Sequence, residues 1–447
     1  MLPWSLREVT ALVNGRQVKG SPEVRVTGVV HDTRNVKRGD LFVAIVGAKQ
    51  DGHRFLKEAA RRGAKGAVVS RLVKGVAIPQ IKVEDTTKAL GELGRAQRLE
   101  WNGPVVVVTG SVGKTTVKDM AAHLLGGSMR VLKTEGNLNN QWGLPLTLLK
   151  LTARHQVAVV ELGINHPGEM EWLSEIARPD VAVVTTIGDA HLGFFKNRKH
   201  LAVEKLKVAA SLRAGGGKVL NADDTLLGER GENVMTFGLK LGQVKARELR
   251  PDGLGTQFIL EAQGERVSTR LNLIGNHNVL NALAAVSTGL TLGIPLRKLA
   301  ERLKSFISQA PMRMEIKNVK GVLFINDAYN ASPTSMEAAL VTFEDLQGSR
   351  RKLAVLGDML ELGSFSKETH ARVVRRAVQG SLDGIVLVGP RMGEAFKGLG
   401  GEAKTNVWPF SRVSHARIFL KSWAERGDAV LLKASRGMKL EKVLEGF

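Results

Sequence analysis

The 447-residue sequence contains no cysteine. Disulfide bonds, thiolate metal sites and a cysteine nucleophile are therefore excluded, and the absence fits a reducing compartment. Aromatic residues make up only 5% of the chain, with a single tyrosine, so few rings could stack on nucleic-acid bases. No uncharged apolar run reaches the roughly 18 residues of a membrane span, and the first residues lack a basic segment followed by an apolar core. These absences predict a cytoplasmic protein without a transmembrane segment.

Acidic residues are in the minority, with 43 Asp and Glu against 65 Lys and Arg, which gives a formal net charge of +22. A charge of this size raises nucleic acid as a partner. However, the basic residues are scattered in short runs, such as those at 61–62 and 350–352. We therefore favour a basic surface suited to small anionic substrates, with no nucleic-acid partner, and keep a nucleic-acid-stimulated NTPase as the alternative.

Four consecutive valines at 105–108 lead directly into the sequence Thr-Gly-Ser-Val-Gly-Lys-Thr-Thr at 109–116. A buried strand followed by a glycine-bracketed turn is typical of a phosphate loop, in which backbone N–H groups point into one concavity. Lys114 would reach the outer phosphates, Thr115 would offer its hydroxyl to Mg²⁺, and the helix expected from 117 would place its N-terminus at the phosphates. Val108 stands where the usual pattern has glycine, so this loop is a shortened one. We expect a nucleoside triphosphate as ligand.

Polar residues follow the next predicted strands of the same segment. Glu161 ends the run at 157–161, and His191 comes shortly after the run at 181–188. Because parallel strand ends meet at one edge of a sheet, both side chains should lie beside the phosphate loop, where they could bind a metal. The amide-rich loop at 134–145 and the polar helix start at 275–281 should also face a ligand.

The segment before the phosphate loop alternates short apolar runs with turn residues, as in a small α/β domain. Asp32, Arg34, Asp51 and His53 could each cap a turn or helix, but together they suggest a polar pocket. A helix is predicted over 84–99, with Leu90, Leu93 and Leu99 facing inward.

A third domain is predicted from about residue 310, because strand patterns at 321–326, 352–357, 384–389 and 429–435 are separated by helical ones. That order indicates an open doubly wound sheet. The residues after its strands should face a crevice, although Asp358 could instead cap a helix and Arg436 could be a surface charge. The set comprises Asn330, Ser332, Asp358, Glu361, Lys433, Ser435 and Arg436.

Along nearly its whole length, the chain resembles the Mur ligases, ATP-dependent enzymes that add amino acids to the UDP-linked muramyl peptide precursor of bacterial cell walls. The stretch 109–116 is similar to that family's shortened phosphate loop. Four further stretches resemble the member that joins D-alanyl-D-alanine to UDP-N-acetylmuramoyl-tripeptide: 136–145, 275–281, 327–333 and 356–363. The resemblance implies amide ligation through an acyl phosphate. A sister ligase that adds diaminopimelate or lysine is the alternative.

The resemblance also implies a role for each matching residue. ATP would be bound by Gly110, Ser111, Val112, Gly113, Lys114, Thr115, Thr116, Asn281, Arg313 and Asp327. Mg²⁺ would be held by Thr115, Glu161, His191 and Lys205, the last as a carbamate formed with CO₂, and Lys114, Lys205 and His191 would be catalytic. The UDP sugar would contact Asp32, Arg34, Asp51 and His53, and the dipeptide would contact Asn330, Asp358, Glu361, Ser435 and Arg436.

The expected architecture is a monomer with three domains. These are a small α/β UDP-binding domain at 1–84, a central P-loop ATPase-like parallel sheet at 85–309, and a Rossmann-like doubly wound domain at 310–447. Three positions depart from the family pattern: Lys207, Asn326 and Ala434. Among them, Lys207 matters most, because its charge lies close in sequence to the proposed carbamate.

Overall fold

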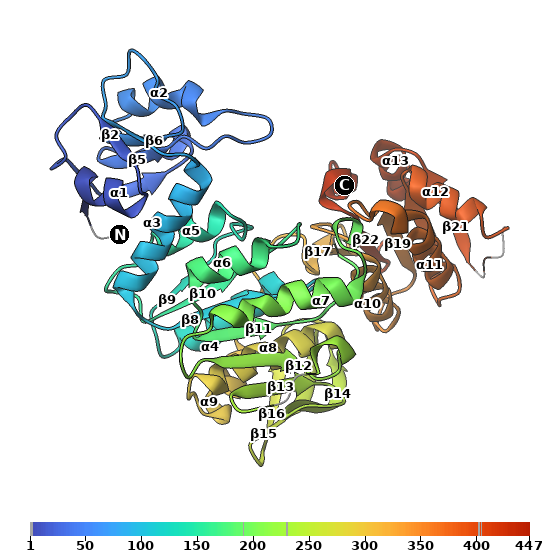
Figure 1. Ribbon diagram of the computed structural model, residues 1–447. Helices are drawn as coiled ribbons and strands as arrows, with labels where there is room; N and C mark the ends of the chain where they lie inside the picture. The colour runs from blue at the N-terminus through green and yellow to red at the C-terminus, as the bar shows by residue number, and fades with distance from the viewer. Residues whose placement is uncertain (1–2, 191, 229–230, 401–402, 404) are drawn as a thin grey trace.

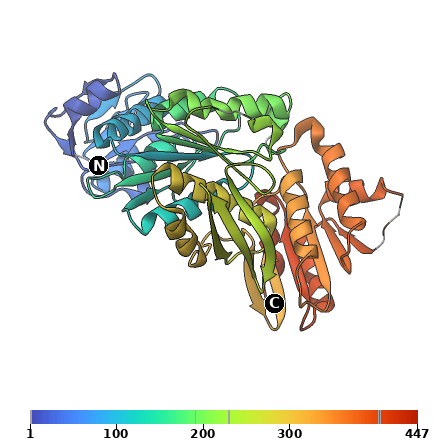
Figure 2. The same cartoon turned by 90° about the horizontal axis from the view of Figure 1, so that it is seen from below.

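Three large β-sheets follow one another along the chain in the computed structural model, which describes residues 3–190, 192–228, 231–400, 403 and 405–447 (Figure 1). We name the N-terminal, central and C-terminal units after these sheets. The N-terminal and C-terminal units lie at opposite ends of the central one in both views (Figures 1 and 2). In the described part of the chain, no helix combines the length and the hydrophobicity needed to cross a bilayer.

The N-terminal sheet has the order β2-β7-β6-β5-β4, and all its pairs except β2–β7 are parallel. Both of its faces are buried: Leu41 and Val43 pack on one side and Phe42 and Ala44 on the other. The elements are β1 (Trp4–Ser5), α1 (Leu6–Leu12), β2 (Arg16–Val18), β3 (Arg25–Val26), β4 (Gly28–Val30), β5 (Asp40–Val43), α2 (Leu56–Arg61), β6 (Gly66–Val69), β7 (Gln80–Lys82) and α3 (Thr86–Trp101).

Helix α3 joins the N-terminal and central units. Leu90 and Leu93 are buried in the N-terminal core, and Arg98 donates a hydrogen bond to Asp180 Oδ2 of the central unit at 2.9 Å. The prediction that Leu99 faces inward is wrong, since this side chain is 45% exposed. Nine residues advance an α-helix by about two and a half turns, which puts Leu99 on the opposite side from Leu90.

The central sheet contains the phosphate-loop strand β8 in its interior. Its order is β16-β15-β14-β13-β12-β11-β8-β10-β9, parallel from β9 to β14 and antiparallel in the β14–β16 hairpins. The elements are β8 (Val105–Thr109), α4 (Lys114–Gly126), β9 (Val131–Lys133), α5 (Gly143–Leu148), β10 (Val157–Glu161), α6 (Glu169–Ala177), β11 (Val181–Val184), α7 (Arg198–Leu206), β12 (Gly217–Asn221), β13 (Val234–Gly238), β14 (Val244–Asp252), β15 (Gly255–Ala262), β16 (Glu265–Leu271), α8 (Asn276–Thr291) and α9 (Leu296–Lys304).

Both faces of this sheet are covered by helices, which explains the unbroken valine run. Val106 and Val108 pack with residues of α4 and α8, whereas Val105 and Val107 pack with residues of α5 and α6. A strand buried on both faces needs apolar side chains at every position rather than at alternate ones.

The C-terminal sheet has the order β17-β18-β22-β19-β20-β21 and is parallel apart from β17. Helices α10 to α12 pack on one face and α13 on the other. The elements are β17 (Glu315–Val319), β18 (Val322–Asn326), α10 (Pro333–Glu344), β19 (Lys352–Gly357), α11 (Ser366–Val378), β20 (Gly384–Val388), α12 (Pro390–Lys397), β21 (Asn406–Phe410), α13 (Val413–Trp423) and β22 (Ala429–Lys433).

The three-part α/β fold with a doubly wound C-terminal sheet is confirmed, but the sequence patterns did not reveal β17 and β21. These are the two edge strands of the C-terminal sheet. Strand β17 has no fully buried residue, and β21 contains Pro409. Edge strands tolerate proline and polar residues because one side of the backbone has no ladder partner, so they lack the apolar run that marks an interior strand.

Candidate active site

The loop between β8 and α4 forms a cradle that side chains would obstruct. Gly110 and Gly113 have φ values of +140° and +84°, which strain any residue with a Cβ atom. A Cβ on Gly110 would lie 2.0 Å from Thr185 Oγ1, and one on Gly113 would lie 2.2 Å from Asn281 Oδ1. The loop thus fits closely under Asn281 and ends at the N-terminus of α4, where backbone N–H groups suit phosphate oxygens.

Glu161 ends β10 beside this loop and is 2% exposed. Its carboxylate accepts hydrogen bonds from Thr115 Oγ1 and from Asn139 Nδ2, both at 2.8 Å. Thr115 and Glu161 therefore present two oxygen atoms together, which fits Mg²⁺, since this ion usually takes one or two carboxylates plus waters and phosphate oxygens. No group of three or more His, Asp or Glu side chains gathers as a metal site within the described residues. His191, the other predicted ligand, lies outside them.

Two lysines lie within electrostatic reach of Glu161. Burial, with a smaller contribution from Arg313, lowers the pKa of Lys114, while Glu161 opposes the change. Lys205, in the last turn of α7, is only 1% exposed. Burial and, next, the charge of Lys114 put the pKa of Lys205 well below its ordinary value. The site therefore favours a neutral amine at Lys205.

Lys207, the departure nearest to Lys205, is engaged elsewhere. Its Nζ lies 2.8 Å from Glu204 Oε1 and 3.8 Å from Glu171 Oε2. The hydrogen bond to Glu204 raises the pKa of Lys207, so this lysine stays charged and neutralises a carboxylate of α7, the helix that ends just before it. Its charge therefore does not conflict with a buried amine at Lys205.

A cavity of about 500 Å³ lies between the central and C-terminal units. The C-terminal side contributes Arg313, whose guanidinium lies 4.0 Å from the Tyr329 ring centroid, and Asp327, whose Oδ2 lies 2.5 Å from Lys433 Nζ. The predicted residues that line this cavity are Ser111, Val112, Gly113, Lys114, Thr115, Thr116, Glu161, Asn281, Arg313, Asp327, Asn330, Ser332 and Lys433. The structure thus brings most of the predicted nucleotide residues, with Thr115 and Glu161 of the predicted metal ligands, together across the two units; Gly110 and Lys205 are not among the residues that line this cavity.

Several residues at the C-terminal strand ends are used internally instead. The Asp358 carboxylate accepts from the backbone N–H groups of Met392 at 2.9 Å and Arg391 at 3.3 Å, and the residue is 3% exposed. The expectation that Asp358 faces the crevice is therefore wrong. Asp358 caps α12, which was the alternative interpretation of this residue. Ser435 is also buried, and its hydroxyl accepts from Leu360 N at 2.9 Å.

Arg436 and Glu361, the other two predicted dipeptide contacts, do not line this cavity. The guanidinium of Arg436 lies 2.6 Å from Glu441 Oε1 and is about half exposed. The backbone carbonyl of Glu361 accepts from Gly193 N of the central unit at 3.3 Å. Glu361 therefore belongs to the contact between two units.

The four N-terminal residues form two hydrogen-bonded groups away from this cavity. Arg34 Nη2 lies 2.5 Å from Asp32 Oδ2, and the hydrogen bond from Arg34 lowers the pKa of Asp32 to about 2. His53 is buried; its Nε2 accepts from Ser70 N at 3.0 Å, and its Nδ1 lies 2.6 Å from Asp51 Oδ1. Nε2 of His53 therefore fastens its turn to the residue after β6, whereas Nδ1 bonds Asp51 within the same turn.

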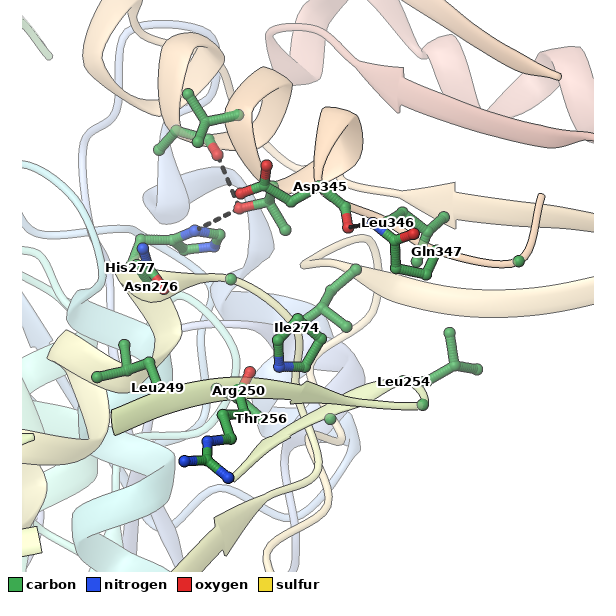
Figure 3. A pocket seen from close by; sticks show the side chains of 18 of the residues that line it. Leu249, Arg250, Leu254, Thr256, Ile274, Asn276, His277, Asp345, Leu346 and Gln347 are labelled. Atoms are coloured by element: carbon green, nitrogen blue, oxygen red, sulfur yellow. Dashed lines mark hydrogen bonds between the residues drawn. The ribbon is translucent and has the colours of Figure 1, made fainter. Parts of the chain in front are cut away.

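A second cavity, of about 750 Å³ and with mostly apolar walls, lies on the other side of His277 (Figure 3). One wall is the β14–β15 hairpin and the other is formed by α10 and the residues after it. His277, Thr334 and Ala338 line both cavities. The dashed line from His277 in Figure 3 marks its hydrogen bond to Thr342, of 3.2 Å between Nδ1 and Oγ1.

The sequence did not single out Asn139, which donates a hydrogen bond to the Glu161 carboxylate. The amide-rich loop 134–145 was the available signal, but it contains three asparagines and nothing local distinguishes the one that reaches Glu161. The Arg313–Tyr329 contact was likewise not predicted. Only the fold brings it about, because β17 and β18 form a hairpin that returns the chain to the same place.

A shortened phosphate loop, a carboxylate beside it and a facing doubly wound unit define an ATP-binding enzyme of the three-part ligase class. Matches to known proteins give the family. Residues 25–98 match the model for "Mur ligase family, catalytic domain", residues 108–289 that for "Mur ligase middle domain", and residues 312–436 that for "Mur ligase, glutamate ligase domain". The chain belongs to the Mur ligase family.

Individual relatives span the whole chain. The UDP-N-acetylmuramoyl-tripeptide--D-alanyl-D-alanine ligase of Bacillus subtilis is 35% identical, over 100% of this chain and 98% of its own. The Escherichia coli enzyme of the same name is 32% identical, over 100% and 99%. Among solved structures, MurF from Acinetobacter baumannii matches with a TM-score of 0.92 at 33% identity, over 99% of this chain and 98% of its own. The Thermotoga maritima MurF ligase in complex with ADP matches with 0.85 at 31%, over 94% and 96%.

Proposed function

We propose that this protein is the ATP-dependent ligase that joins D-alanyl-D-alanine to UDP-N-acetylmuramoyl-tripeptide in peptidoglycan precursor synthesis. The observation that carries the proposal is the cavity between two units, in which Lys114 and Glu161 face Arg313 and Asp327. Relatives that bear this activity in their names match the chain from end to end.

The chemistry follows from what these side chains can do. A carboxylate is a poor acylating agent, so the tripeptide carboxylate first attacks the γ-phosphate of ATP, ADP leaves, and the product is an acyl phosphate with a good leaving group. Lys114 and Arg313 stabilise the negative charge on the transferring phosphoryl group from opposite units. The amine of D-alanyl-D-alanine then attacks the acyl carbon, and phosphate leaves. Since the cavity walls come from two units, docking them excludes water that would hydrolyse the acyl phosphate.

Mg²⁺ would be held by Thr115 and Glu161, with His191 as a further proposed ligand, and would supply charge neutralisation at the phosphates. We also propose that Lys205 works as a carbamate. Only a neutral amine adds to CO₂, and the buried position of Lys205 lowers its pKa in the required direction. The product is an anion, which attracts the charge of Lys114 and can accept a cation.

Other assignments also belong to this proposal. The three domains are 1–84, 85–309 and 310–447, and the protein is a cytoplasmic monomer. The UDP moiety contacts the N-terminal unit near Asp32 and Arg34. Among the predicted dipeptide residues, Asn330 is the candidate that lines the cavity.

The deciding experiment measures phosphate release from ATP by the purified protein with UDP-N-acetylmuramoyl-tripeptide, in parallel reactions that contain D-alanyl-D-alanine, D-alanine, L-lysine or no amine. Among these amines we expect only the dipeptide to support turnover, and the assay is run with tripeptides that carry lysine and with tripeptides that carry diaminopimelate at the third position. Use of a single amino acid on a shorter UDP-muramyl peptide would reassign the protein to a sister ligase. ATP hydrolysis that rises with added DNA and falls steeply with salt would replace the ligase proposal altogether.

A further inference from the structure

Asp189 is a buried carboxylate of the central unit that is bonded mainly by the C-terminal unit. It follows β11 and is 6% exposed. Its Oδ2 accepts from Arg372 Nη2 of α11 at 2.6 Å and from Thr334 Oγ1 of α10 at 3.2 Å. Arg372 is held in turn by Glu337 of α10, with 2.9 Å between Nε and Oε1. Charge-assisted hydrogen bonds are stronger than neutral ones, and here the Asp189 side chain is 8% exposed while that of Arg372 is 47% exposed.

The segment that carries Asp189 also contacts the phosphate loop. Ser111 N donates to Thr186 O at 2.7 Å, and Ser111 Oγ donates to Gly188 O at 3.4 Å. On its other side the segment touches α10 so closely that a Cβ on Gly188 would lie 2.9 Å from Thr334 Oγ1. Residues 186–189 therefore form a short link, with the phosphate loop on one side and the C-terminal unit on the other.

Apart from Ile274, which packs in the C-terminal core, the further contacts described here between the two units are polar or between backbones. A Cβ on Gly193 would lie 2.8 Å from Gly363 N, so two glycines let the backbones of the central and C-terminal units touch. His277 and Thr342 contribute one hydrogen bond, and beside them lies the apolar cavity of Figure 3 rather than packed side chains. An interface of this kind can open without exposing a large packed core, as polar interdomain interfaces do. Its few directional bonds then decide how well the units dock.

We propose that Asp189, Arg372 and Thr334 form a docking latch, which couples the position of the C-terminal unit to the phosphate loop through residues 186–189. Arg372 and Thr334 are positioning residues, since they act on the loop through Asp189. The inference deepens the proposed ligase function and rests on it only for its kinetic readout.

The kinetic test compares Arg372→Ala, Asp189→Asn and the double variant with the unchanged enzyme. We expect kcat for ligation to fall by about tenfold in each single variant, the effect of one charge-assisted hydrogen bond, while KM for the UDP-tripeptide stays within about twofold. The double variant should be no worse than either single one, because both remove the same bond. Arg372→Lys should recover part of kcat.

Arg375→Ala is the matched control, since Arg375 is an exposed arginine on the same helix α11. It should retain the kcat of the unchanged enzyme. Equal losses in Arg375→Ala and Arg372→Ala, or additive losses in the double variant, would overturn the latch.

A structural readout separates the latch from the ligase proposal. Because the chain has no cysteine, Lys240→Cys and Lys397→Cys add the only two thiols for spin labels, one on each unit, at exposed positions. With ATP bound, the labelled enzyme should give one narrow distance distribution, and Arg372→Ala should broaden it or shift it to longer distances. An unchanged distribution in Arg372→Ala overturns the latch even where ligation is lost. If no amine substrate is used but the distribution broadens as expected, the latch stands and the ligase proposal fails.

Discussion

The central and C-terminal sheets both present polar residues where their parallel strands end, yet the two sets serve different purposes. At the central sheet, Lys114 and Glu161 face the cavity between the units. At the C-terminal sheet, Asp358 caps α12 and Ser435 accepts from the backbone of Leu360. The topology thus places a polar residue that ends a strand at the binding edge of the sheet. The residue is available to a ligand only if no nearby backbone group forms a hydrogen bond with its side chain.

The difference has a local cause. After β8 the phosphate loop leads into α4, whose N-cap residue is Gly113 and therefore has no side chain to cap the N–H groups of the first turn, which lies at the cavity. Helix α12 instead begins beside the end of β19, and its N-terminal N–H groups are satisfied by Asp358. The N-terminus of α4 is therefore available to a ligand, whereas the N-terminus of α12 is capped by the protein itself.

The largest effect should come from Lys114→Ala, which removes a cation from the central-sheet side of the cavity. We expect ligation to fall by about 1,000-fold, in line with the loss of a group that stabilises transition-state charge. The midpoint of thermal unfolding should be unchanged, because no core packing is lost. Lys133→Ala is the control, as that lysine pairs with Asp119 at the surface and should be neutral for ligation. Near-normal product formation by Lys114→Ala would remove it from the site.

Lys205→Ala should reduce ligation by about 100-fold, because it removes the proposed anionic partner of the cation. Added acetate or formate should restore part of the activity, whereas Lys207→Ala should be nearly neutral, since Lys207 is bonded to Glu204.

The lowered pKa of Lys205 also predicts a pH effect. Activation by bicarbonate should be present above the lowered pKa and be lost as the pH falls through it, when the amine becomes protonated. Activity that ignores both bicarbonate and short carboxylates would contradict the carbamate.

Asp358→Ala tests whether Asp358 serves to cap α12 rather than to bind a ligand. We expect it to lower the free energy of unfolding of the C-terminal unit by about 1–2 kcal/mol, the effect of losing a helix cap, while KM for D-alanyl-D-alanine changes little. Asn330→Ala should show the reverse, with a raised dipeptide KM and normal stability, because Asn330 lines the cavity. Denaturant unfolding followed with steady-state kinetics distinguishes the two. A raised dipeptide KM in Asp358→Ala at full stability would reopen a ligand role for it.

The smallest effect concerns His277, which lies between the two sheets. Burial lowers the pKa of His277 to about 4, with Lys433 acting in the same direction and Asp327 against it. Since the unfolded chain takes up this proton near pH 6.5, stability should be full above that pH and decline as the pH falls towards 4. In His277→Gln the decline over this range should be shallower, as seen by thermal unfolding at a series of pH values. Identical slopes would mean that other groups cause the acid sensitivity.

The sequence by itself determined the parts of the protein whose signals are local. The valine run, the glycine positions and the lysine of the phosphate loop lie within twelve residues, and a strand buried on both faces must be apolar throughout. Glu161 could be placed because the ends of neighbouring parallel strands share one edge. The interior strands β8, β10 and β11 of the central sheet and β18, β19, β20 and β22 of the C-terminal sheet follow from the same reasoning. The edge strands β17 and β21 do not, since they bury too little to require an apolar run, and the interior strands β7 and β13 were not predicted individually either.

Only the tertiary structure decided which polar groups stay open to a ligand and which are used by the protein. Asp358 meets its partners 33 and 34 positions along the chain, and Asp189 meets Arg372 at a separation of 183. No periodicity or motif records such pairs, because they depend on how segments distant in sequence approach one another, within one unit for Asp358 and between two units for Asp189. Hydrogen bonding is short-ranged and directional, so a carboxylate becomes a cap, a latch or a metal ligand according to which donor the fold brings within about 3 Å.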